Sequence, residues 1–170
     1  MTGSAGATDV ALVVGVGNPD RGDDGVGRAV AALVRGRALP GVEVAEVRAD
    51  PTVLLDLWED RHPVVLVDAV CSGASAGTLV ELDLRRHRLP RTAIASTHGF
   101  GVAEVVELGR ALGRLPAALV FVGVELGDVG LGAPISAQVL AGMTEAANRV
   151  AALMRLATIR SSPARCSLRG

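Results

Sequence analysis

Acidic residues crowd a glycine-rich turn near the start of the chain. Residues 13–30, VVGVGNPDRGDDGVGRAV, run from an apolar stretch through a G-x-G turn into a helical pattern. Asp20 stands where a dinucleotide-binding turn needs its third glycine, and Asp23 and Asp24 would repel a phosphate at the helix start. The turn therefore predicts contact with a cation, and we expect no nucleotide cofactor. Asp23 or Asp24 could instead only cap the helix, because helix N-termini also favour carboxylates.

Two further ionisable side chains lie where strands are expected to end. Asp68 follows the apolar run VVLV, and His98 lies in the turn STHGFG. In open α/β sheets, functional groups gather beyond the carboxyl ends of the strands. These residues could therefore share one solvent-reachable crevice with the acidic turn. The alternatives are structural, since a strand-end aspartate can accept hydrogen bonds from loop amides and His98 can be a hydrogen-bonded turn residue.

Apolar runs alternate with helical patterns along the chain. The pattern predicts strands at residues 10–17, 42–48, 63–70, 77–84 and 117–126, and helices at 25–37, 51–59, 100–112 and 136–157. Such alternation predicts a single three-layer α/β domain, with a central twisted, mostly parallel sheet of about five strands and helices on both faces. The strand at 77–84 is the expected antiparallel one. We assign the domain to residues 10–160, with flexible tails at 1–9 and 161–170.

Composition excludes several classes of protein. The 170 residues suit one domain, and no apolar run reaches the roughly 20 residues of a membrane span. The start, MTGSAGATDV, lacks the pattern of a signal peptide. A net charge of −1 gives no excess of basic residues with which to bind nucleic acid. Two cysteines suit a reducing compartment. We therefore expect a cytoplasmic monomer with no membrane or nucleic-acid partner.

Four segments together carry a family resemblance. GVGNPDRGDDGVG, VVLVDAV, STHGFGVAEVVELGRALGRLP and FVGVEL resemble the hydrogenase maturation proteases in order and spacing, from about Ala11 to Ala152. Members of that family are endopeptidases that trim the C-terminal extension from the large subunit of nickel–iron hydrogenases. The resemblance therefore implies peptide-bond hydrolysis, with the large-subunit precursor as partner.

The resemblance also implies a ligand set. Asp24, Asp68 and His98 match the family's metal-binding residues, and some relatives carry Glu at the position of Asp24. Two oxygens and one imidazole nitrogen suit nickel or zinc, and three ligands leave coordination positions open for a reaction. In the family, nickel already installed in the precursor is the recognition element. We thus expect nickel to arrive with the substrate, and Asp24 and Asp68 to take part in catalysis.

Other readings stay open at this point. Cys71 is three residues from Asp68, but no cysteine-protease signature accompanies His98. The G-x-S-x-G match GASAG at residues 73–77 leads into the strand expected at 77–84 and not into a helix, so it is no nucleophile elbow, and no H-E-x-x-H helix occurs. A conventional nucleophile or zinc protease is therefore disfavoured. A non-cleaving checkpoint or metal carrier would use the same ligands, whereas a general metal-dependent aminopeptidase or amidohydrolase would need more. Either metal or a carboxylate could activate water. The remaining groups have no assigned role: Asp20, Asp23, Cys71 and Glu125, with Asn18 expected to stabilise the turn and His62 and His87 expected at the solvated surface.

Overall fold

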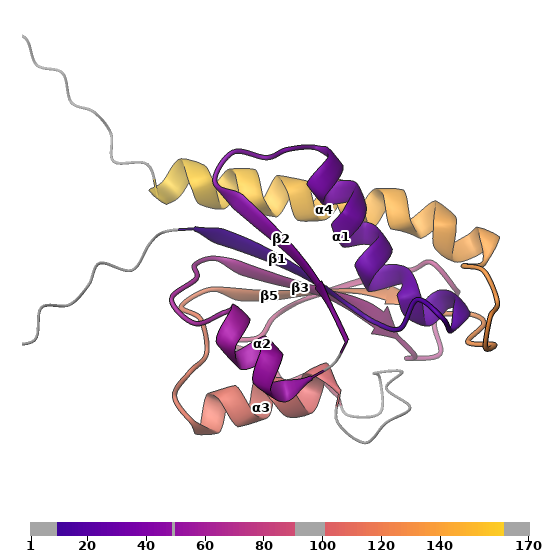
Figure 1. The fold of residues 1–170 in the computed structure, drawn as a ribbon, viewed down its shortest axis with the longest axis horizontal. Coiled ribbons are helices and arrows are strands. Elements are labelled where there is room, and N and C mark those ends of the chain that lie inside the picture. The colour runs from indigo at the N-terminus through magenta and orange to yellow at the C-terminus, as the bar shows by residue number, and fades with distance from the viewer. Residues whose placement is uncertain (1–9, 49, 91–100, 162–170) are drawn as a thin grey trace, which may run out of the picture.

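The computed structural model describes residues 10–48, 50–90 and 101–161, with side chains up to residue 157 (Figure 1). Its five strands are β1 (Ala11–Val16), β2 (Val42–Val47), β3 (Val64–Val70), β4 (Leu79–Asp83) and β5 (Leu119–Glu125). They form one sheet in the order β2-β1-β3-β5-β4. β4 pairs antiparallel with β5, and the other pairs are parallel. The predicted sheet and its antiparallel strand are confirmed.

Helices cover both faces of the sheet. They are α1 (Val26–Gly36), α2 (Pro51–Leu57), α3 (Val102–Ala111) and α4 (Ala137–Ser161). α1 and α4 lie on one face, and α2 and α3 lie on the other (Figure 1). A 3-10 helix, η1 (Gly22–Gly25), precedes α1 and was not expected. α4 continues past residue 157, where the predicted helix ends, and includes Ser161, the first residue of the tail expected at 161–170. The remainder of that tail and the tail expected at 1–9 lie outside the described residues.

The apolar strands are explained by this layering. All seven residues of β3 are buried, and successive residues of the central strands contribute to the cores on opposite faces of the sheet. Leu66 packs with the cluster that includes Trp58 of the α2 side, whereas Val65 and Val67 pack with the cluster that includes Val30 of α1. A strand covered on both faces needs an uninterrupted apolar run, which is the pattern the sequence has.

Two glycines bring α1 unusually close to the sheet. A Cβ atom at Gly27 would overlap the carbonyl oxygens of Val16 and Val67 and lie 2.9 Å from the Cα atom of Asp68. At Gly15, a Cβ would likewise overlap the backbone of Gly27. The absence of both side chains lets the first turn of α1 cross directly over β1 and β3. The residues just before α1 are thereby held beside the carboxyl half of β3.

This close approach predicts a large difference between two Gly→Ala substitutions in the same helix. Gly27→Ala should lower the free energy of unfolding by about 1–3 kcal/mol or more, because the added methyl meets backbone that cannot move aside. Gly36→Ala is the matched control, since nothing lies within 4 Å of its Cβ position. It should be neutral or stabilising by up to about 1 kcal/mol, because alanine favours the helix. Urea denaturation of both variants measures the difference; equal stability would contradict the packing argument.

In the part of the chain that the structure describes, no helix combines the length and the apolar character needed to cross a membrane.

Candidate active site

Asp68 is a carboxylate buried near the carboxyl end of the central strand β3. Only 6% of the residue is exposed, and one carboxylate oxygen, Oδ1, accepts a hydrogen bond from the N–H of Ala69 at 2.8 Å. Burial raises the pKa of Asp68 to about 7; the Ala69 hydrogen bond opposes this, and the nearby negative charge of Asp24 adds to it. Asp68 is therefore far less exposed than expected at a solvent-reachable edge, and only a small part of it reaches solvent.

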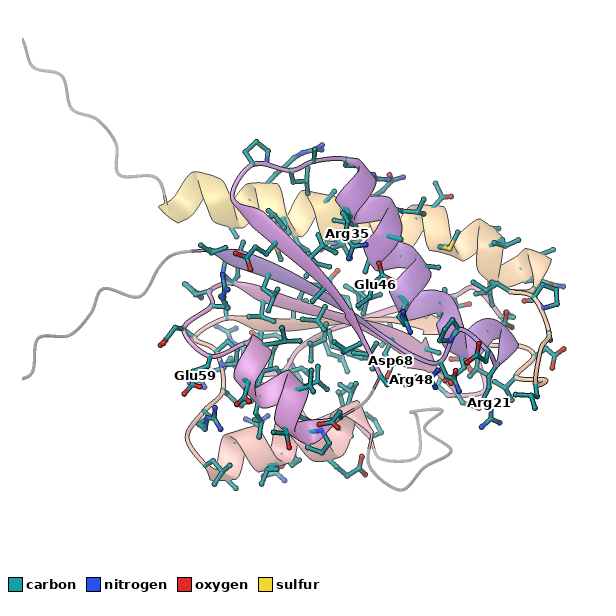
Figure 2. The ribbon with its side chains drawn as sticks, viewed as in Figure 1. Arg21, Arg35, Glu46, Arg48, Glu59 and Asp68 are labelled. Atoms are coloured by element: carbon teal, nitrogen blue, oxygen red, sulfur yellow. The ribbon has the colours of Figure 1, made fainter. Side chains whose placement is uncertain are left out.

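Asp24 lies in η1 and is half-buried. Its carbonyl oxygen accepts from the N–H of Asn18 at 3.2 Å, which ties η1 back to the turn after β1, as expected for Asn18. Its negative charge acts on the pKa of Asp68, and Gly27, one turn further on, packs against the backbone of Asp68. The structure thus brings two of the three predicted ligands near each other. Figure 2 shows Asp68 at the end of the sheet where Arg21 and Arg48 also lie.

The third predicted ligand, His98, lies with Thr97 in residues 91–100, outside the described residues. Within the described ranges, no group of three His, Cys, Asp or Glu side chains is arranged to hold a metal ion. The described residues therefore include two of the three predicted metal ligands, the carboxylates of Asp24 and Asp68. Carboxylate oxygens are hard-to-borderline donors, and a cation placed between them relieves their mutual repulsion. The pair is suited to a divalent cation that brings or receives further ligands.

Asp23 has a different task from its neighbour Asp24. It is completely buried, and its carboxylate accepts four hydrogen bonds from three residues of one distant loop: Gly127 N–H at 2.8 Å, Asp128 N–H at 2.7 Å, Ser136 N–H at 2.6 Å and Ser136 Oγ–H at 3.0 Å. Burial raises the pKa of Asp23, but these bonds outweigh it and hold the pKa below its ordinary value. The N-cap alternative is wrong, because the capping positions of η1 and α1 are Arg21 and Gly25.

Glu125 is likewise structural within the described chain. Only 2% of it is exposed, and its carboxylate accepts from the N–H and Oγ–H of Ser72, both at 2.8 Å, and from the N–H of Gly73 at 2.9 Å. Glu125, which had no role assigned from the sequence, holds the loop that follows β3. Cys71, which begins this loop, is exposed. Asp20 is exposed too and forms an ion pair with Arg48 at 3.0 Å.

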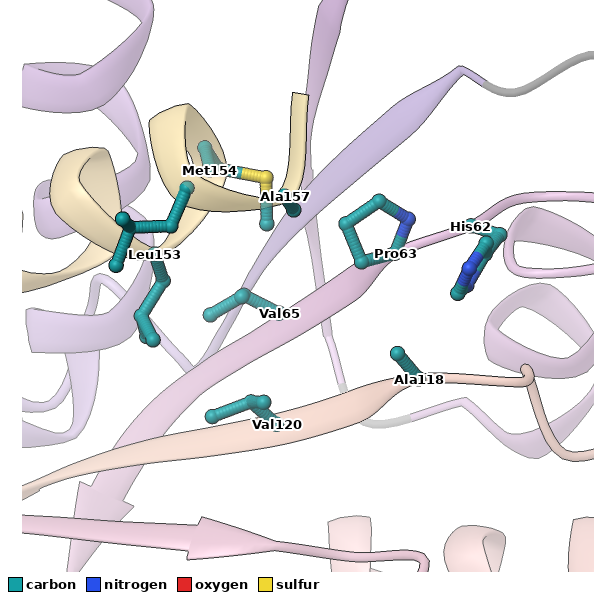
Figure 3. A pocket seen from close by; sticks show the side chains of 9 residues that line it. His62, Pro63, Val65, Ala118, Val120, Leu153, Met154 and Ala157 are labelled. Carbon is teal, nitrogen blue, oxygen red and sulfur yellow. The ribbon is translucent and has the colours of Figure 1, made fainter. Parts of the chain in front are cut away.

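The two remaining histidines lie away from the carboxylate pair. His87 is exposed, as expected, with its Nδ1 atom 3.2 Å from the carbonyl oxygen of Asp83. His62 is not a solvated surface residue: its Nδ1 atom is buried and has no hydrogen-bond partner among the described residues. It lines an apolar pocket of about 420 Å³ with Pro63, Val120 and Met154 (Figure 3). That pocket lies at the amino ends of β3 and β5, opposite Asp68.

Similarity to known proteins agrees with the fold. Residues 28–153 match the family model described as hydrogenase maturation protease. The chain is 32% identical over 117 residues to the hydrogenase expression/formation protein HupD of Bradyrhizobium diazoefficiens, covering 66% of this chain and 60% of that protein. The chain thus spans about three-fifths of the curated relative that it matches.

Solved structures give the same class of protein. The hydrogenase maturating endopeptidase HybD from E. coli is similar with a TM-score of 0.69 and 25% identity, covering 86% of this chain and 92% of that one. An endopeptidase from Escherichia coli is similar with a TM-score of 0.72 and 26% identity, over the same shares. These relatives define a class of peptide-bond hydrolases. The chain belongs to the hydrogenase maturation protease family.

The raised pKa of Asp68 makes this residue a source of pH-dependent instability. The folded chain keeps a proton on Asp68 up to about pH 7, whereas the unfolded chain releases it near pH 3.8. The contribution of Asp68 to stability is therefore complete below pH 3.8 and is lost as the pH rises to about 7. The difference between the pKa values of Asp68 in the folded and unfolded chain corresponds to roughly 4 kcal/mol of unfolding free energy.

Asp68→Asn should consequently stabilise the protein at alkaline pH. Asparagine keeps the size of the side chain and an acceptor for Ala69 N–H, but it never carries the buried charge. We expect its free energy of unfolding to exceed that of the wild type by roughly 2–4 kcal/mol at pH 8, and the gain to vanish near pH 4. Urea denaturation across this pH range measures the difference. If the variant is no more stable than the wild type at pH 8, the buried negative charge of Asp68 does not destabilise the fold and the prediction is wrong.

Asp23→Asn is the control of opposite sign. The lowered pKa of Asp23 means that its carboxylate contributes stability above pH 3.8, which is lost only as the pH falls through the lower folded value. The amide presents hydrogen-bond donors to groups that are themselves donors, so this variant should be less stable than the wild type at pH 8.

Proposed function

We propose that the protein is an endopeptidase that removes the C-terminal extension from the large-subunit precursor of a nickel–iron hydrogenase after nickel insertion. Asp24 and Asp68, with His98, contact the nickel that the precursor carries, so the metal is part of the substrate. The observation that carries the proposal is the pair of mutually repelling carboxylates at the carboxyl edge of the sheet, in a chain of this family.

The environment of each carboxylate supports this role. Asp68 is surrounded by the apolar strands of the central sheet, where an anionic oxygen attracts a cation more strongly than it would in water. Asp24 is half-buried, so part of this residue remains accessible to a substrate. A large, folded precursor can present a bound metal to such a pair without the metal leaving its own ligands.

The reaction requires water to attack the scissile carbonyl carbon and the carbon–nitrogen bond to break. Nickel held at the pair supplies Lewis acidity toward the carbonyl oxygen or toward a water molecule. A carboxylate oxygen of Asp24 or Asp68 takes the proton from the attacking water and passes it to the departing amine. The chain needs no nucleophile of its own for this sequence, and exposed Cys71 has no part in it.

Processing of a matching precursor tests the proposal directly. With nickel-loaded precursor, wild-type protein should produce the shorter subunit on a gel, whereas nickel-free precursor should stay intact. Asp24→Asn and Asp68→Asn should abolish processing, because a neutral amide is a far poorer metal ligand and base. Cys71→Ala is the matched control and should process normally.

Three outcomes would contradict parts of this scheme. Equal cutting of nickel-free precursor would refute the nickel dependence, and loss of activity in Cys71→Ala would transfer the chemistry to a thiol. An unchanged precursor mass after incubation would favour a non-cleaving checkpoint or carrier. Cleavage of short reporter peptides would favour a general aminopeptidase or amidohydrolase.

Calorimetry addresses His98 separately. The free protein should bind nickel weakly, because the proposed site has only three protein ligands and relies on the precursor for the rest. His98→Ala should weaken this binding further by removing the imidazole. Unchanged nickel affinity in the variant would remove His98 from the ligand set.

Location and assembly are parts of the same proposal. The two cysteines support a reducing compartment such as the cytoplasm. We predict a monomer, with the large-subunit precursor as its partner.

A further inference from the structure

The loop between β5 and α4, residues 126–136, carries a strongly exposed apolar side chain. Leu131 is 85% exposed, more than the other large hydrophobic residues that the structure describes as exposed. A single exposed leucine is common on protein surfaces and needs no explanation by itself. The unusual feature is how firmly the surrounding backbone is held.

Both ends of this loop are fastened to one carboxylate. Asp23 accepts from Gly127 and Asp128 at the start of the loop and from Ser136 at its end. In return, the N–H of Asp23 donates to the carbonyl oxygen of Asp128 at 2.8 Å. Five hydrogen bonds therefore join the loop to η1, four accepted by the carboxylate and one donated by the backbone.

The residues on either side of Leu131 are held as well. The N–H of Gly130 donates to Oδ1 of Asp128 at 2.9 Å, and the N–H of Gly132 donates to the carbonyl oxygen of Asp20 at 2.8 Å. The loop tip is thus fixed to the turn after β1, which also leads to Asp24. In Figure 1 this loop, in orange, lies at the same end of the sheet as η1.

We propose that Leu131 is a docking contact for the large-subunit precursor, and that Asp23 is the positioning residue that fixes this contact relative to Asp24. The inference rests on the proposed function for the identity of the partner. An apolar side chain on a backbone that is already ordered loses little conformational freedom on binding, so its burial contributes to affinity. Because the loop and Asp24 share one hydrogen-bonded unit, a protein that covers Leu131 is placed beside the carboxylate pair.

Binding of nickel-free precursor isolates this contact from the metal site. By calorimetry, Leu131→Ala should weaken the affinity about tenfold, as the loss of a central apolar contact does. Leu131→Met should restore most of it, because the volume and apolar character are kept. Leu112→Ala is the matched control: Leu112 is 56% exposed and lies after α3, at the end of the fold away from Asp68, so affinity should not change.

Processing of nickel-loaded precursor gives a second readout. Leu131→Ala should raise KM about tenfold while kcat stays within about twofold of the wild type, because the contact is made equally before and during the reaction. Asp23→Asn should raise KM and also speed hydrogen exchange at the amides of Gly127, Asp128 and Ser136, which lose their acceptor. Ser136→Ala, which removes only the hydroxyl bond, should show a smaller rise in KM.

The outcomes separate this inference from the proposed function. Wild-type protein that binds the precursor through Leu131 without cutting it would refute the proteolysis and keep the docking contact. Normal cutting with unchanged affinity and KM in Leu131→Ala would overturn the docking contact alone. Absence of any precursor binding by the wild type would overturn it too. Loss of self-association in Leu131→Ala, with precursor binding unchanged, would assign the leucine to a second copy of the chain.

Discussion

The close crossing of α1 over β1 and β3 is the constraint on which the rest of the site depends. Two glycines, Gly15 and Gly27, permit backbone to lie directly against backbone, and no other residue type fits there without displacing a strand or the helix. The crossing sets where η1 begins and therefore where Asp24 meets Asp68. All seven residues of β3 are buried, so Asp68 lies in low-polarity surroundings that make its ionisation costly.

The carboxylates of Asp23 and Asp68 affect the stability of the fold in opposite directions, and the reason is the number of hydrogen-bond donors around each. Asp23 is as deeply buried as Asp68, yet its carboxylate has four donors. Among the described residues, the carboxylate of Asp68 accepts from Ala69 alone, and it faces the charge of Asp24. Burial therefore does not by itself determine whether a carboxylate stabilises the fold. Four donors make Asp23 a structural anchor, whereas Asp68, with one donor among the described residues, is costly to ionise.

Much of the fold could be predicted because its signals are local. Apolar runs covered on both faces and Pro51 at a helix start are readable within short windows, and the predicted strands and helices were all found close to their expected ranges. The proximity of Asp24 and Asp68 also followed from topology, since parallel strands end at one edge. The anchoring roles of Asp23 and Glu125 could not be predicted, because their donors lie more than 50 residues away in sequence. The buried Nδ1 atom of His62 could not be predicted for a similar reason, since the residues that line the neighbouring pocket come from β3, β5 and α4.

A single carboxylate, that of Asp23, holds both ends of residues 126–136. Evolutionary changes at this anchor and changes at the loop tip therefore have different consequences. Asp23 cannot vary without releasing both ends of the loop from η1, because its carboxylate accepts from backbone N–H groups at each end. Those same N–H groups are present whatever the side chains are, so the tip between them is free to exchange residues such as Leu131. Duplicated copies of such a gene can therefore diverge at the loop tip while inheriting an unaltered Asp23 and an unaltered pair of carboxylates, so this surface and the buried acids can change one at a time.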